Sequence, residues 1–218
     1  MRYSVESRAS RPISVNGLFL HQLPISRQGA TEFTYSRFLV PWLMDYEGLG
    51  LFCDEDMVVT GDVHELFRYC VKRLDEPWDV AFVHHEHLYE RPSVMVFNNQ
   101  NLQHLTPEFV EDKSNRMFDF AWAKNAGDLP REWNHLCGID SPREDAKLYH
   151  FTQGIPYWKE TRGLPEDHFW FEAFEGMVKS HEWIDFHKDT IHFKPVMRRY
   201  LKGYGLNIGQ GPDYPKLS

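Results

Sequence analysis

The stretch of sequence that decides the fold is GLGLFCDEDMVVTGDVHELF, residues 48–67. A short apolar run, Leu51–Cys53, ends in three consecutive acids and is followed at once by a second β-prone run, Met57–Val59. Like charges beside a hydrophobic strand repel one another and resist desolvation, so we expect a compensating group next to them, most simply a divalent cation. The chain then turns into a helix, with Asp62 as N-cap and Glu65 completing a capping box.

The composition of the whole chain limits its partners. With 218 residues, 42% of them hydrophobic, the chain is long enough for one domain with a substantial core. The net charge of −8 argues against a general nucleic-acid binder, and a phosphate-bearing ligand would need a local cation, arginine or lysine. Three cysteines give no disulfide framework and fit a reducing cytosol. No apolar leader opens the chain and no apolar run approaches ~20 residues, so we expect a cytoplasmic protein without a transmembrane segment.

Strands and helices alternate through the first two thirds of the chain. This pattern predicts an α/β sandwich with a largely parallel sheet, in which ligands lie beyond the carboxyl ends of the strands. Residues 1–186 are expected to form the domain and residues 187–218 a loosely packed tail. The expected strands cover 51–53, 57–59, 78–85, 93–98 and 146–151; the expected helices cover 32–48 with a break at Pro41, the segments that begin at Asp62 and at Thr106, and 165–180.

The acidic cluster has the chemistry of a metal site. Asp54 and Asp56 can both reach one cation, and their hard oxygens suit Mg²⁺, Mn²⁺ or Ca²⁺. Such a metal keeps open positions for substrate phosphates and acts as a Lewis acid on a leaving diphosphate. His150, at the end of a later strand, would add a nitrogen ligand and shift the preference toward Mn²⁺. Since 15 aspartates give about one Asp-x-Asp pair by chance, the alternative is a plain acidic turn.

Three segments, taken in order, carry a family resemblance. They are TEFTYSRFLVPWLMDYEGLGLFCDEDMVVTGDVHELF (31–67), SVMVFN (93–98) and KLYHFTQGIPYW (147–158). Together they resemble the retaining glycosyltransferases of family 8, the glycogenin and lipopolysaccharide galactosyltransferase group, over about residues 3–175. The resemblance implies a GT-A-type, Rossmann-like α/β sandwich with a mostly parallel central sheet, a UDP-linked hexose donor, and a saccharide or other hydroxyl acceptor.

The resemblance also implies three groups of site residues, without a covalent nucleophile. The implied groups are Asp54, Asp56 and His150 as ligands of Mn²⁺ or Mg²⁺, Arg37, Glu55 and Gly154 on the donor side, and Asn98, Trp133 and Asn134 on the sugar and acceptor side. Several have plainer interpretations. Arg37 can be a structural ion-pair residue, Asn98 can cap a strand end, and Trp133 can belong to the core. HHEH at 84–87 lacks the spacing of a helical zinc motif and is expected to be a surface loop.

Two departures from the family pattern leave alternatives open. Met1 falls inside the helix that follows the family's first, base-binding strand, so this sequence is expected to lack that strand. Pro156 stands where a diphosphate-binding lysine often follows the histidine, and Lys159 is not equivalent to it. One alternative is therefore a truncated, non-catalytic relative that binds a sugar or a partner. Another is a metal-dependent phosphohydrolase that uses the same acids.

Overall fold

Two small sheets carry the fold. The computed structural model describes residues 1–31, 34–74 and 77–180; the expected tail lies outside these residues. The first sheet has the order β1 (Leu49–Cys53), β4 (Val94–Asn98), β3 (Val80–Phe82), β5 (Ala126–Asp128). The second has the order β2 (Met57–Val59), β7 (Leu148–His150), β6 (His135–Leu136).

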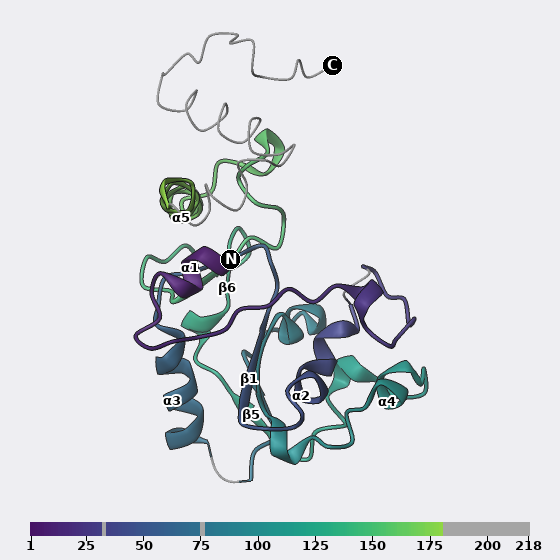
Figure 1. Ribbon diagram of the computed structural model, residues 1–218. Coiled ribbons are helices and arrows are strands. Elements are labelled where there is room, and N and C mark those ends of the chain that lie inside the picture. The colour runs from purple at the N-terminus through teal and green to yellow at the C-terminus, as the bar shows by residue number, and fades with distance from the viewer. Residues whose placement is uncertain (32–33, 75–76, 181–218) are drawn as a thin grey trace.

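Short helices connect and cover these sheets. The α-helices are α1 (Arg2–Glu6), α2 (Val40–Leu43), α3 (Val63–Arg73), α4 (Pro107–Glu111) and α5 (Asp167–Lys179). The 3-10 turns are η1 (Leu20–Gln22), η2 (Ser36–Leu39), η3 (Leu88–Ser93), η4 (Asn99–Asn101), η5 (Met117–Asp119), η6 (Arg131–Trp133) and η7 (Lys159–Thr161). In Figure 1, α3 lies on one side of the sheet that contains β1 and β5, α2 and α4 lie on the other, and α5 stands beside α1. None of the helices in the described part of the chain has the length and apolarity needed to cross a membrane.

The capping signals in the sequence act as expected. The Asp62 carboxylate accepts a hydrogen bond from the backbone N–H of His64 at 3.0 Å, and α3 begins directly after it. The Thr106 hydroxyl accepts one from the backbone N–H of Phe109 at 3.2 Å, with Pro107 in the first turn of α4. These bonds satisfy backbone donors that have no partner inside the helix. Both predicted helix starts are confirmed.

The α/β class is confirmed, but the sheets are mixed. β1 and β3 both pair with β4 in the antiparallel direction, and β2 pairs with β7 likewise. Among the strands of the described residues, only the pairs β3–β5 and β6–β7 are parallel. The sequence pattern indicates how elements alternate, whereas strand direction depends on pairing between segments far apart in the chain. The expectation of a largely parallel sheet is therefore wrong.

Several expected elements are shorter than predicted, and two strands were not predicted. The strand expected over 78–85 covers only Val80–Phe82. The helix expected over 32–48 is reduced to η2 and α2, because Pro41 lies in the first turn of α2 and starts a new helix there; residues 32–33 are not described. The strand expected over 146–151 covers Leu148–His150. β5 and β6 are strands of three and two residues that no local pattern announces.

The core lies on both faces of β4. Met95 and Phe97 pack with the hydrophobic cluster that includes Phe38 of η2, while Val94 and Val96 pack with the cluster that includes Leu66 of α3. Successive side chains of a strand point to opposite faces, so a strand that is apolar at every position serves two cores. The second cluster also receives side chains from β2 and β7. It therefore joins the two sheets.

The other face of the second sheet is covered by α5. Val58 of β2 and Tyr149 of β7 belong to a third cluster with Phe169 of α5, and the Tyr149 and Phe169 rings stack with centroids 4.1 Å apart. Since side chains alternate along β7, Leu148 and His150 point to the opposite face, toward the second cluster. His150 is thereby directed into the interior between the sheets, with 2% of its surface exposed.

Gly50 of β1 allows α2 to approach the sheet closely. A Cβ atom at this position would lie 2.5 Å from Val40 Cγ1 and 3.1 Å from Met44 Sδ. We expect Gly50→Ala to lower the free energy of unfolding by about 1–3 kcal/mol through overpacking. In a double-mutant cycle followed by urea denaturation, the penalty should shrink in a Val40→Ala background, which removes the nearest atom. Equal penalties in both backgrounds would contradict this account of the contact.

Candidate functional site

The pairing of β2 with β7 places the second acid beside His150. Met57, the first residue of β2, lies opposite His150, the last residue of β7. The next backbone N–H, that of Phe151, donates to the carbonyl oxygen of Asp56 at 3.1 Å. As a result, His150 Nε2 is 3.3 Å from Asp56 Oδ1. The site lies where β1 and β7 end and β2 begins, and not at a common edge of parallel strands.

The first acid is held by Arg37. Arg37 Nη2 lies 3.1 Å from Asp54 Oδ1, with 8% and 15% of the two side chains exposed. The guanidinium also donates to the Pro92 carbonyl at 3.0 Å and lies over the Phe52 ring, 4.9 Å from its centroid. Burial raises the pKa of the Asp54 carboxyl, and the positive charge of Arg37 opposes that shift. Arg37 therefore holds the Asp54 carboxyl in place and favours its charged form.

Two carboxylate oxygens at this site have no hydrogen-bond donor. Asp54 Oδ1 and Asp56 Oδ1 are buried and accept no hydrogen bond, although Arg37 and His150 lie within ion-pair distance of them. The neighbouring nitrogen atoms lie close to these oxygens but are not aligned to form hydrogen bonds with them. Buried oxygens without donors are costly, so these atoms fit a site that receives a ligand.

A metal ion fits the donor set only after a local adjustment. The separation of 3.3 Å between Asp56 Oδ1 and His150 Nε2 resembles the ~3 Å between neighbouring ligand atoms on an ion with bonds of about 2.1 Å. Asp54, however, is turned toward Arg37. Among residues 1–31, 34–74 and 77–180, no three His, Cys, Asp or Glu side chains already form a group that would hold a metal ion. The ligand types fit Mn²⁺ or Mg²⁺, and a third ligand would come from rotation of Asp54.

The far side of the His150 ring contacts two residues that hold it in place. His150 Nδ1 lies 3.1 Å from Asn134 Oδ1, a hydrogen bond, and 3.5 Å from Glu90 Oε2. Glu90 Oε1 in turn accepts a hydrogen bond from the Thr152 hydroxyl at 2.9 Å. The sequence did not indicate a role for Glu90 or Thr152, because nothing in the local pattern around either residue shows that the two lie in contact. His85, buried nearby, donates from Nε2 to the Asn134 carbonyl at 3.0 Å.

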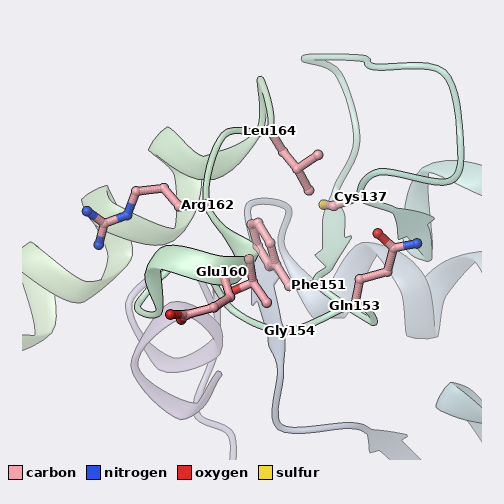
Figure 2. A pocket seen from close by; sticks show the side chains of 8 residues that line it. Cys137, Phe151, Gln153, Gly154, Glu160, Arg162 and Leu164 are labelled. Carbon is pink, nitrogen blue, oxygen red and sulfur yellow. The ribbon is translucent and has the colours of Figure 1, made fainter.

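Gly154 lines a small cavity beyond β7. Its φ of +112° is in the region that favours glycine, and a Cβ atom there would lie 2.6 Å from Thr161 Cγ2. The cavity of about 170 Å³ is also lined by Cys137, Phe151 and Leu164. Figure 2 shows Leu164 directed toward Cys137, while the guanidinium of Arg162 is turned away from both. This volume is below the ~300–1,000 Å³ of typical small-molecule sites, so it fits only part of a nucleotide sugar.

The remaining expected site residues do not join this group of buried side chains. Asn98 pairs with Leu49, at the opposite end of the β1–β4 ladder from Cys53 and the acids, and its amide donates to the Trp78 carbonyl at 3.1 Å. Trp133 is 2% exposed and packs in the core cluster that joins the sheets. Glu55 is exposed in the turn between β1 and β2. The structure therefore brings together Arg37, Asp54, Asp56, Asn134 and His150, and leaves Asn98 and the Trp133 ring outside this group.

Comparison with other proteins gives distant relatives. No family model matches the chain. It is 24% identical over 217 residues to the protein named Protein CDI of Arabidopsis thaliana, and the match covers 83% of this chain and 82% of that protein.

The chain is also similar to solved glycosyltransferase structures. It resembles the WbbM bifunctional glycosyltransferase (18% identity, TM-score 0.46, 74% of this chain and 38% of that one) and GlyE of Streptococcus pneumoniae TIGR4 (15%, 0.49, 82% and 49%). It resembles the galactosyltransferase LgtC too (12%, 0.44, 75% and 74%). The chain thus spans about two fifths of the matched WbbM chain and half of the GlyE chain. Because all three TM-scores lie below 0.5, these likenesses carry no conclusion about what the chain does.

Removing one partner of the ion pair between Arg37 and Asp54 should lower the stability of the protein. Arg37→Met leaves a buried carboxylate without its cation, so we expect the free energy of unfolding to fall by about 3–5 kcal/mol. The double variant Arg37→Met/Asp54→Asn should recover part of the loss, because the uncompensated charge is removed. Urea denaturation measures both. Arg143→Met, which breaks the more exposed pair with Asp145, is the control and should change stability far less; a loss as large as that of Arg37→Met would refute the account.

His85 should make stability depend on pH. Burial lowers the pKa of its imidazole, so the folded protein resists protonating it. The unfolded chain takes up this proton as the pH falls through about 6.5, and the folded state does so only at lower pH. Stability from this group is therefore present at neutral pH and is lost below about pH 6.5. His85→Gln should flatten the decline in urea-derived stability between about pH 7 and 5, whereas the exposed neighbour His87→Gln should not. Identical pH slopes for all three proteins would rule this out.

Proposed function

We propose that the chain is a metal-dependent glycosyltransferase that moves a hexose from a UDP-linked nucleotide sugar to a saccharide or other hydroxyl acceptor. The observation that carries this proposal is the pair of buried oxygens, Asp54 Oδ1 and Asp56 Oδ1, that accept no hydrogen bond and lie beside basic groups. Two parts of the proposal rest on the family resemblance of the sequence alone: that the sugar is a hexose, and that the transfer retains the configuration of its anomeric carbon.

In this proposal Asp54, Asp56 and His150 hold Mn²⁺, or Mg²⁺ in its place. The ion, when bound, would act as a Lewis acid that stabilises the negative charge of the departing diphosphate. A protein with a net charge of −8 needs such a local positive charge before it can bind a nucleotide diphosphate.

The chain's own residues prepare the site for this ligand. Arg37, fixed by the Pro92 carbonyl and the Phe52 ring, keeps the Asp54 carboxylate paired until a ligand competes for it. His150 is buried, with Nδ1 in contact with Asn134 and Glu90 and Nε2 facing Asp56. Gly154 lets the backbone after β7 pass close to the Thr161 side chain, where a Cβ atom would lie 2.6 Å from Thr161 Cγ2. The three cysteines are free thiols, which supports a reducing cytosol as the place of action.

The rival proposal is a non-catalytic relative that binds a sugar or a protein partner. One observation favours it, because within the described residues no three potential ligands already form a metal-holding group. Under this proposal the pair Arg37–Asp54 is permanent and no divalent ion enters.

The deciding experiment is calorimetric titration of UDP into the protein with and without Mn²⁺. We expect UDP to bind only when Mn²⁺ is present, since the acids would otherwise repel its diphosphate. Asp56→Asn should weaken Mn²⁺ binding by at least ~10–100-fold, which is the usual loss when a residue that only hydrogen-bonds to a metal ligand is removed. Asp128→Asn, which makes the same charge change at an exposed acid paired with His84, should bind as the wild type does. Absence of UDP binding under both conditions would favour the non-catalytic rival.

A further inference from the structure

We infer that Asn134 is a positioning residue: held by Glu90, it fixes His150 in the tautomer that carries its proton on Nδ1 and presents the unprotonated Nε2 to Asp56. The effect of Asn134 on metal binding rests on the proposed function, whereas its effect on the tautomer of His150 does not. The sequence resemblance places Asn134 on the sugar and acceptor side. Its side chain is instead fully buried and reaches His150.

The orientation of the Asn134 amide follows from its partners. Asn134 Nδ2 lies 3.1 Å from the backbone carbonyl oxygen of Glu90, which can only accept a hydrogen bond, so the NH₂ group must face it. The reversed amide would set two oxygens against each other at this distance. The Asn134 backbone is also held, because its carbonyl accepts from His85 Nε2 at 3.0 Å and its N–H donates to the Arg131 carbonyl at 3.2 Å. The amide oxygen therefore faces His150.

This orientation decides where His150 carries its proton. Asn134 Oδ1, at 3.1 Å from His150 Nδ1, is an acceptor, so Nδ1 must be the donor. The second group near Nδ1 is Glu90 Oε2 at 3.5 Å, which also attracts a proton to that nitrogen. Glu90 is itself held by the Thr152 hydroxyl at 2.9 Å. A neutral His150 ring therefore leaves Nε2 with a lone pair.

The consequence appears on the opposite edge of the ring. His150 Nε2 and Asp56 Oδ1 are 3.3 Å apart and are not aligned for a hydrogen bond, so a buried nitrogen lone pair faces a buried carboxylate oxygen. Two acceptors in this position repel each other unless a cation lies near both. Histidines that bind metal ions commonly donate their other ring N–H to an acceptor, which fixes the ring and raises the basicity of the ligating nitrogen. Asn134 and Glu90 supply this arrangement from within the fold.

A purely structural role for Asn134 would be to satisfy buried backbone groups, and it predicts no preferred tautomer of His150. The tautomer therefore distinguishes the two roles. A histidine side chain free in water favours the Nε2–H form, so an Nδ1–H ring in the folded protein requires an imposed hydrogen bond. Nitrogen NMR of the imidazole reports which ring nitrogen is protonated without any metal or substrate.

The experiment uses metal-free full-length protein labelled with ¹⁵N-histidine, at about pH 8, above the ordinary His pKa. The His150 signals are assigned by their loss in His150→Gln. We expect Nδ1 to be protonated and Nε2 unprotonated in the wild type, with a shift toward the Nε2–H form in Asn134→Ala. A wild-type ring protonated on Nε2, or on both nitrogens, overturns the inference, and so does an unchanged tautomer in Asn134→Ala.

The matched control is Asn99→Ala. Asn99 is also fully buried, and its amide donates to the Glu47 carbonyl at 2.7 Å, but it lies by the start of β1, away from His150. This variant should keep the wild-type His150 signals even if it loses similar stability. If Asn134→Ala does not fold, the wild-type spectrum alone can still overturn the inference, because it shows which nitrogen of His150 is protonated.

A parallel titration with Mn²⁺ separates this inference from the proposed function. Asn134→Ala should bind Mn²⁺ about 10–100-fold more weakly than wild type, while Asn99→Ala should not. If the wild type has the Nδ1–H tautomer but binds no Mn²⁺, the metal-dependent function fails and the positioning role of Asn134 stands. If Mn²⁺ binds and the wild-type ring is in the Nε2–H form, the function stands and the positioning role fails.

Discussion

The antiparallel pairing of β2 with β7 is the constraint on which the candidate site depends. This pairing sets Met57 opposite His150 and places Asp56 next to the imidazole. It also decides which way the ring points, because His150 shares its face with Leu148 while Tyr149 faces α5. A slip of one residue in the register would turn every side chain of β7 to the other face. The candidate site thus depends on a backbone ladder of three residue pairs.

Each acid at the site lies beside a basic side chain, but its hydrogen bonds are incomplete. Asp54 faces Arg37 and Asp56 faces His150, so each acid has a basic partner within 3.3 Å. Burying a carboxylate removes water from it, and a neighbouring basic side chain offsets that cost only when the hydrogen bonds are complete. Here one oxygen of each carboxylate accepts no hydrogen bond. An arrangement of this kind contributes poorly to stability, which is why its interpretation as a ligand site is preferred to that of a structural ion-pair network.

Local features of the fold could be predicted from the sequence, and features that depend on distant pairing could not. Asp62 and Thr106 were recognisable as helix caps because a cap and its partner lie within three residues. The direction of β4 leaves no local mark, since it is set by contact with β1 and β3. Because β4 runs antiparallel to β1, Asn98 lies at the end of β1 that is remote from the acids. β5, with the sequence Ala-Gly-Asp, is a strand only because it pairs with β3.

The wide separation of the site residues along the chain links ligand binding to folding. Asp56 and His150 are 94 positions apart (150 − 56), and they come into contact only when β2 is paired with β7. Bringing such distant segments together costs loop-closure entropy, which the native pairing must offset. A chain in which β2 and β7 have not paired therefore has the acids without the imidazole beside them. Any molecule that needs both binds the native state alone, and by mass action it raises the population of native chains at the expense of incomplete ones.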